Sequence, residues 1–178
     1  MPSESRPVVR TASVTDAAAI AEIHVLSWQA AYAGHLPGEF LAGLSVDDRR
    51  ERWAGRLVTG PRPGGVFVVT LEDEVTGFVA VGPSRDTDAV PGTAELHAIY
   101  LHPHHWHRGQ GRLLHDHALA ELADQGFHRV TLWVLRTNAL ARQFYERAGW
   151  SPDGATKTDT IGDRDLPLAE VRYRKPLR

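Results

Sequence analysis

The fold is decided by residues 94–112, which read AELHAIYLHPHHWHRGQGR. The mostly apolar run at 94–101 predicts a strand, and a helix is expected at 109–125, after a basic turn with two glycines. The first turn of a helix carries unpaired N–H groups and the positive end of the helix dipole, so it binds anions. Arg108 and Arg112 add charged donors. The segment therefore predicts a pyrophosphate site.

Two glycines before a helix are by themselves a weak signal, since the same pattern serves ordinary turns. A Rossmann fingerprint needs a third glycine, but Leu114 stands at that position. A Walker loop needs Gly-Lys-Ser/Thr, which the segment also lacks. These two classes of nucleotide site are therefore not favoured.

Hydrophobic periodicity and breakers place the other elements around this segment. A strand at 7–10 precedes a helix that Thr15-Asp16 caps and that runs to residue 32. The further elements are a helix at 45–57, a hairpin of strands at 66–71 and 75–81, a strand at 130–135, a helix at 138–148 and a last hairpin from 150 to 174. The order β-α-α-β-β-β-α-β-α-β-β predicts a single mixed α/β domain over residues 1–178.

Composition limits the function classes. The formal net charge of −2 gives no bulk attraction to nucleic acid or to an anionic membrane, so no nucleic-acid and no membrane partner is expected. The chain has no cysteine, which excludes disulfides, thiolate metal sites and a cysteine nucleophile and fits a cytoplasmic location. No apolar run approaches the roughly 20 residues that cross a bilayer.

At the basic turn the sequence resembles the GNAT superfamily, the GCN5-related N-acetyltransferases, whose signature is [Gln/Arg]-x-x-Gly-x-[Gly/Ala]. The matching window is 106–111, with both glycines and the common Arg108 in place. Trp106 stands where the family has Gln or Arg, so the contact assigned to that position does not carry over. Further matches lie at 96–103, 132–138 and 141–150, and the N-terminal part also fits, so the resemblance covers essentially the whole chain.

The resemblance implies the GNAT fold, a mostly antiparallel central sheet whose fourth and fifth strands splay apart and which helices flank. It also implies an N-acetyltransferase that uses acetyl-CoA as acetyl donor and no metal. The acceptor would be a primary amine of a small molecule or peptide, attacking directly in a ternary complex. The cofactor-binding residues that it implies are Ile99, Tyr100, Leu101, His107, Arg108, Gly109, Gln110, Gly111, Arg112, Asn138 and Arg142. Asn138 either bonds pantetheine or merely caps its helix.

Acetyl transfer to an amine needs a base for the ammonium and an acid for the leaving thiolate. The resemblance points to Tyr145 as the acid, although Tyr145 could equally be the second aromatic of a core stripe with Phe144. It points to Glu95, fourteen residues before Gly109, as the base, with His97 as rival or partner. On an extended strand Glu95, His97 and Ile99 share a face. Glu95 could deprotonate the ammonium directly, if burial raises its pKa towards neutrality, or it could act through a water molecule. The alternative is that Glu95 is an ordinary exposed residue of the strand.

The resemblance places the acceptor near Trp28 and Tyr32, one helical turn apart, where aromatic faces suit a flat or cationic amine. Plain core packing would use the same two residues. Asp86 and Asp88 could attract a cationic amine. Six histidines between residues 102 and 117 crowd one loop and helix start, but only Asp116 accompanies them as a carboxylate, so no metal is predicted.

Two questions stay open at this level. The last strands of such folds often pair across a subunit interface, so a homodimer is an open alternative. A non-catalytic acyl-CoA-binding or sensor module on the same fold is the alternative to an enzyme, and turnover of acetyl-CoA with an amine distinguishes the two.

Overall fold

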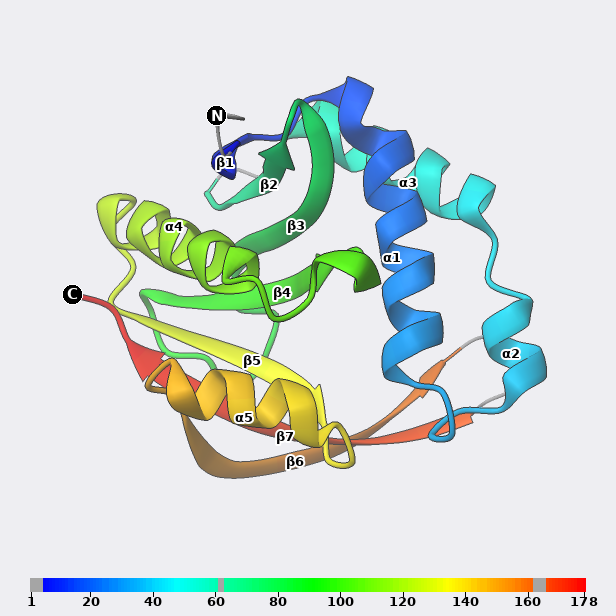
Figure 1. The fold of residues 1–178 in the computed structure, drawn as a ribbon. Helices are drawn as coiled ribbons and strands as arrows, with labels where there is room; N and C mark the ends of the chain where they lie inside the picture. Colours follow the sequence, from blue (N-terminus) through cyan, green and yellow to red (C-terminus); the bar gives the residue numbers. More distant parts are fainter. Residues whose placement is uncertain (1–4, 61–62, 162–165) are drawn as a thin grey trace.

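The computed structural model describes residues 5–60, 63–161 and 166–178. The strands of these residues form one seven-stranded sheet in the order β1-β2-β3-β4-β5-β7-β6 (Figure 1). Their bounds are β1 Val8–Thr11, β2 Gly65–Leu71, β3 Glu74–Pro83, β4 Thr93–Leu101, β5 Arg129–Leu135, β6 Ser151–Ile161 and β7 Leu166–Pro176. The helices are α1 Ala17–Ala31, α2 Gly38–Ala42, α3 Val46–Thr59, α4 Gln110–Asp124 and α5 Ala139–Arg147, with short 3-10 turns at Val14–Asp16 and Pro103–His105.

Helices cover both faces of the sheet, as Figure 1 shows. Leu114 and Leu122 of α4 pack with Tyr145 of α5 against one face. Ile20 of α1 and Trp53 of α3 pack against the other. The predicted mixed α/β fold, with all of its long helices and strands, is thereby confirmed. The short helix α2 and the two 3-10 turns were not predicted, because runs of three to five residues carry too little periodicity.

One predicted helix start is wrong in its detail. Asp16 precedes α1 as expected, but its side chain forms no cap bond to that helix. The carboxylate instead accepts hydrogen bonds from Arg10 at 2.8 Å and from the Ser13 amide at 2.7 Å. Ser45 does cap α3, accepting from the Asp48 amide at 3.1 Å. The acidic group at the start of α1 thus ties the helix to β1.

The centre of the sheet contains its one parallel pair. β4 pairs with β5 only at Thr93–Arg129, Ala94–Val130 and Glu95–Thr131, and every other neighbouring pair of strands is antiparallel. Beyond Glu95 the two strands diverge. The part of β4 from residue 96 to 101 therefore has a strand partner, β3, on one side only.

A β-bulge in β4 decides which side chains face which helices. Ala98 pairs with Ala80 while Leu96 pairs with Val81, which leaves His97 without a counterpart on β3. Leu96 and Ile99 consequently both lie on the α4 side, whereas Ala98 and Tyr100 lie on the side of α1 and α3. The prediction that Ile99 shares a face with Glu95 and His97 is therefore wrong, because it assumed strict alternation.

Candidate active site

The basic turn before α4 presents free backbone donors. The N–H groups of residues 107–112 make no hydrogen bond among the described residues, and the first bond of the helix runs from the Leu113 amide to the Gly109 carbonyl at 3.1 Å. Positive φ angles at His107 (60°) and Gly109 (79°) shape this turn. Such a row of amides at a helix N-terminus fits a pyrophosphate.

Gly111 keeps this row open. A Cβ at Gly111 would lie 3.4 Å from the Leu101 side chain and 3.7 Å from that of Phe144, so a methyl group would be in ordinary contact with both. The backbone at 107–112 thus has the free amides that the predicted cradle needs, and its binding of a cofactor stays a prediction.

The side chains of the turn serve different purposes. Arg108 and His107 are exposed, and Arg112 binds Asp116 through its Nε at 2.8 Å. Gln110 is only 3% exposed, and its Oε1 accepts a hydrogen bond of 2.6 Å from the Thr76 hydroxyl. Gln110, one of the predicted cofactor residues in this turn, can therefore contribute its backbone N–H group but not its side chain.

Trp106 replaces the family's Gln or Arg with a structural contact. Its indole Nε1 donates to the Leu101 carbonyl at 2.9 Å, and the Ser27 hydroxyl donates to the same oxygen at 2.7 Å. The last carbonyl of β4 is thereby fixed to both the turn and α1. Trp106 thus anchors the turn against the strand on which the resemblance places pantetheine.

Helix α5 holds three predicted site residues. Asn138 caps it by accepting from the Ala141 amide at 3.1 Å, which confirms the capping alternative for its carbonyl oxygen. Arg142 donates to the Tyr173 hydroxyl at 3.1 Å and to the Arg136 carbonyl at 3.0 Å, so its described contacts attach α5 to β7. Its role towards a cofactor stays a prediction.

Tyr145, the third, is buried at the divergence of β4 and β5. Its ring lies among those of Phe144, Trp150 and Tyr173, at centroid distances of 5.4 to 6.4 Å. Burial, with the nearby Tyr100, raises the pKa of Tyr145, so its phenol stays protonated at neutral pH, as an acid must. No hydrogen bond of its hydroxyl is found among the described residues, so this donor is available.

Trp28, Tyr32 and Tyr100 meet on the α1 side of β4. Trp28 and Tyr32 are in edge contact at 4.8 Å, and His24 stacks on Tyr100 at 5.1 Å with an interplanar angle of 18°. Burial raises the pKa of both Tyr32 and Tyr100. The predicted acceptor residues therefore adjoin β4 directly, with Tyr100 as the common neighbour of α1 and the strand.

Glu95 is buried but ionised. Its carboxylate accepts from the Arg85 guanidinium at 2.6 and 3.2 Å and from the Arg85 amide at 2.9 Å. Burial alone would raise the pKa of Glu95, but the hydrogen bonds and charge of Arg85 outweigh it and lower the pKa below its ordinary value. The expectation of a pKa raised towards neutrality is therefore wrong, because the sequence did not reveal Arg85 as the partner.

His97, the bulge residue, is held between two elements. Its Nδ1 lies 3.0 Å from Arg56 Nη2 of α3, and its Nε2 lies 3.3 Å from the Pro83 carbonyl. Because a guanidinium can only donate, Nδ1 is the acceptor and Nε2 carries the proton. Burial, with the charge of Arg85, lowers the pKa of His97 to about 4. His97 is thus neutral at pH 7, and its Nε2 lies 3.9 Å from Glu95 Oε2.

The structure adds a carboxylate that the sequence analysis missed. Glu170 of β7 lies opposite Leu135 of β5, with Oε2 3.4 Å from Lys157 Nζ of β6. Burial raises the pKa of Glu170, and the charge of Glu95 adds to the rise although Lys157 opposes it. No motif marks Glu170, because β7 joins β5 only through the tertiary fold.

Other predicted groups are engaged elsewhere. Arg172 binds Asp86 at 3.0 Å and both Asp88 and Asp153 at 2.7 Å, so one guanidinium is shared by three carboxylates. The suggestion that Asp86 and Asp88 attract an amine stays a prediction. Buried His115 accepts from Trp150 Nε1 at 2.8 Å and lies 2.7 Å from Asp116. In the part of the chain that the structure describes, no three His, Cys, Asp or Glu side chains gather as metal ligands would, and no helix is long and apolar enough to cross a bilayer.

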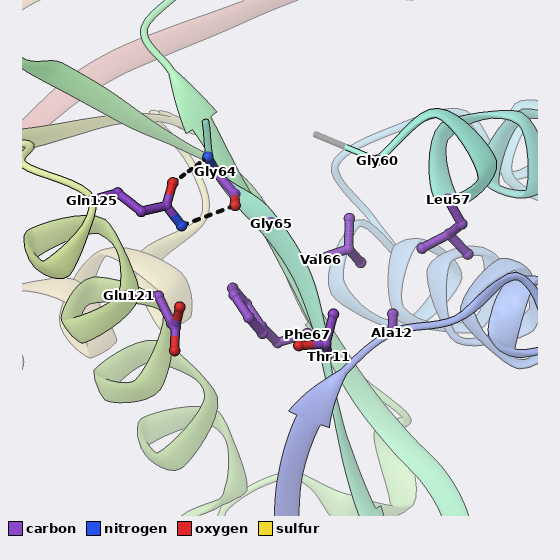
Figure 2. Close-up of a pocket in the computed structure, with 10 residues that line it drawn as sticks. All are labelled: Thr11, Ala12, Leu57, Gly60, Gly64, Gly65, Val66, Phe67, Glu121 and Gln125. Carbon is purple, nitrogen blue, oxygen red and sulfur yellow. Dashed lines mark hydrogen bonds between the residues drawn. The ribbon is translucent and has the colours of Figure 1, made fainter. Parts of the chain in front are cut away.

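A separate hollow of about 250 Å³ lies at the other end of the sheet, between α3 and the end of α4 (Figure 2). Gln125 closes one side of it by bonding both the amide and the carbonyl of Gly64, at 2.6 and 3.1 Å. None of the predicted site residues lines this hollow. We therefore place the candidate active site at the divergence of β4 and β5.

Comparison with known proteins identifies the family of the chain. The acetyltransferase (GNAT) family matches residues 19–150. An uncharacterized N-acetyltransferase of Bacillus subtilis, YuaI, is 33% identical over 94% of this chain and 88% of its own length. The L-amino acid N-acyltransferase MnaT of Escherichia coli is 28% identical over 80% of this chain and 78% of its own.

Solved structures share the fold. A putative acetyltransferase of Salmonella typhimurium, solved with its cofactor acetyl-CoA, aligns with a TM-score of 0.70. The alignment covers 97% of this chain and 94% of that one, at 23% identity. At this identity the likeness concerns the fold alone.

Proposed function

Because the chain belongs to the GNAT family of N-acetyltransferases, we propose that it moves an acetyl group from acetyl-CoA to a primary amine by direct attack in a ternary complex. The observation that carries the proposal is the divergence of β4 from β5 beside a turn of free amides at 107–112. The Escherichia coli relative is named for L-amino acids, which favours a small-molecule acceptor over a peptide.

The residues present fit acetyl-CoA. The amides of 107–112, with the exposed Arg108, would hold the pyrophosphate, and the backbone of β4 at 99–101 would bind pantetheine along the edge that lacks a strand partner. When bound, acetyl-CoA supplies the acetyl group as a reactive thioester. The Tyr145 phenol, protonated and without a partner among the described residues, would deliver a proton to the leaving sulfur.

Two carboxylates would attract the ammonium form of the acceptor and accept its proton. Glu95, held as an anion by Arg85, attracts the ammonium and takes its proton through water. Glu170, whose pKa burial raises, is the stronger direct proton acceptor. His97 is neutral and lies between Arg56 and Pro83, so we assign it a positioning role beside Glu95 rather than that of the base.

The test combines binding with turnover. Calorimetric titration of the protein with acetyl-CoA, NADH and ATP should show micromolar binding of acetyl-CoA alone. Thiol release from acetyl-CoA should then depend on an added small amine. Binding without amine-dependent release would support a sensor module instead, and no binding of acetyl-CoA by folded protein would overturn the proposal.

A further inference from the structure

Two arginines of helix α3 lie near the candidate site and have no carboxylate partner among the described residues. Arg49 and Arg56 are half-buried, and burial lowers the pKa of each. Neither forms an ion pair within the described residues, whereas their exposed neighbour Arg50 binds Asp47 at 3.1 Å. Because desolvating a cation is costly, a half-buried guanidinium without an anion is a position that an anionic ligand would stabilise.

The contact that Arg49 does make is incomplete. Arg49 Nη1 lies 3.2 Å from His24 Nε2, and Trp53 Nε1 lies 3.2 Å from His24 Nδ1. Both partners can only donate, and burial lowers the pKa of His24 to about 3, so His24 is neutral. A neutral imidazole has a single acceptor nitrogen. One of the two donors is therefore left without an acceptor.

A further donor in the same place has no well-formed hydrogen bond. The indole Nε1 of Trp28 is buried and meets no acceptor with hydrogen-bond geometry, although Trp28 lowers the pKa of the neighbouring Tyr100 phenol as a weak donor to it would. The Arg49 guanidinium carbon lies 5.5 Å from the centroid of the Trp28 ring. A buried N–H without an acceptor costs about 1–3 kcal/mol. Arg49, His24 and Trp28 together therefore offer more N–H donors than the surrounding protein has acceptors.

We infer that Arg49 and the Trp28 indole bind a carboxylate carried by the acceptor amine, as in an α-amino acid. The two oxygens of a carboxylate supply the acceptors that this cluster lacks and the charge that Arg49 lacks. The inference rests on the proposed function, because it names the substrate class of that same site.

The rest of the site complements such a substrate. Tyr100 links the cluster to the proposed acid, because the charge of Arg49 acts on the Tyr100 phenol and Tyr100 in turn acts on the Tyr145 phenol. Two carboxylates are available for the ammonium: Glu170, whose charge acts on Tyr100, and Glu95, whose charge acts on Glu170. A molecule that carries both a carboxylate and an amine, such as an α-amino acid, complements a site that offers an unpaired cation and two carboxylates.

The test compares three acceptors that differ only at one position: L-phenylalanine, L-phenylalaninamide and 2-phenylethylamine. The same comparison with the leucine and methionine series covers smaller side chains. We expect kcat/KM for the acid to exceed those of the amide and the plain amine by roughly 10- to 100-fold, the range of a charge-assisted hydrogen bond. Arg49→Met should remove this preference and leave the plain amine within about threefold, Arg49→Lys should restore part of it, and Arg50→Met should not change it.

A second measurement does not need turnover. Calorimetric titration with 3-phenylpropionate, which has the carboxylate but no amine, should show binding to the wild type and to Arg50→Met but not to Arg49→Met. Carboxylate binding that depends on Arg49, without acetylation of any amine, would overturn the proposed function and leave only the carboxylate site at Arg49 and Trp28 standing. Acetylation with equal kcat/KM for the acid, the amide and the plain amine would overturn the inference but not the proposed function. An equal fall in kcat/KM for all three acceptors in Arg49→Met would do the same.

Discussion

Arg85 binds both carboxylate oxygens of Glu95, with its Nη2 2.6 Å from Oε1 and its Nε 3.2 Å from Oε2. Glu95 is almost fully buried while the Arg85 side chain is 68% exposed. The pair therefore keeps a charge inside the sheet that burial alone would neutralise. It makes Glu95 a fixed anion next to the reaction site, and several consequences can be measured.

Removing Arg85 should change the protonation of Glu95. In Arg85→Gln the pKa of Glu95 should rise, because burial then acts without the opposing hydrogen bonds. If Glu95 relays the proton, the acid limb of the pH profile of kcat/KM moves to higher pH. The exposed Arg129→Gln serves as control. A profile that stays in place in Arg85→Gln would exclude Glu95 from proton transfer.

Glu170 should contribute more directly to the deprotonation of the amine. Glu170→Gln keeps the shape of the side chain but cannot accept a proton, so we expect kcat to fall roughly 100-fold or more, as for loss of a general base. The affinity for acetyl-CoA should be unchanged. Measuring kcat with one amine of high pKa and one of low pKa distinguishes a general base from a residue that only positions the substrate. An amine that is already neutral at the assay pH needs no base, so its kcat should fall less in Glu170→Gln. Equal losses on both amines would argue against a base.

Tyr145→Phe should slow the chemical step without unfolding the protein. Only the hydroxyl is lost, the ring contacts with Phe144 and Trp150 stay, and no described hydrogen bond is broken. We expect kcat to fall by roughly 100-fold, with the melting temperature and acetyl-CoA affinity close to wild type. An unchanged kcat would reduce Tyr145 to a core residue.

Gly111 allows a test of the phosphate cradle with a built-in control. Gly111→Ala places a methyl group in ordinary contact with Leu101 and Phe144, so this variant should fold and retain most of its affinity. Gly111→Glu adds bulk and a negative charge beside the amides of 107–112 and should abolish acetyl-CoA binding in calorimetry. Full affinity in Gly111→Glu would place the pyrophosphate elsewhere.

Buried histidines should make the protein acid-sensitive. The folded-state pKa values of His24 and His97 are about 3 and about 4, below the ordinary value of 6.5. The unfolded chain therefore binds more protons in this range, and the free energy of unfolding falls as pH drops below 6.5 until the folded values are reached. Each histidine contributes a slope of at most about 1.4 kcal/mol per pH unit.

Urea unfolding between pH 7 and pH 4.5 measures this slope. His97→Gln should flatten it, because one of the histidines with a lowered pKa is then absent, while His24, His105 and His115 remain. Constant stability over that interval in the wild type would show that neither His24 nor His97 is buried in its neutral form.

Much of the fold could be predicted from the sequence because its signals are local. The glycines and arginine at 108–111, the Ser45 cap and the apolar periodicities each act within a few residues. Predictions that depended on strict alternation failed at His97, where a bulge needs the register of β3 to be recognised. The face of Ile99 was assigned wrongly for that reason.

The sequence by itself determined the family, the order of the elements and the backbone of the anion-binding turn, since these depend on residue type and spacing along the chain. Only the tertiary structure decided the charge state of Glu95, the burial of Glu170 within reach of the charge of Glu95, and the convergence of Arg49, His24 and Trp28. These residues come from separate helices, strands and loops, so their contacts exist only after α1 and α3 have packed on the sheet and β7 has paired with β5. Desolvation and charge pairing, which set the chemistry of the site, depend on distances that the linear sequence does not contain.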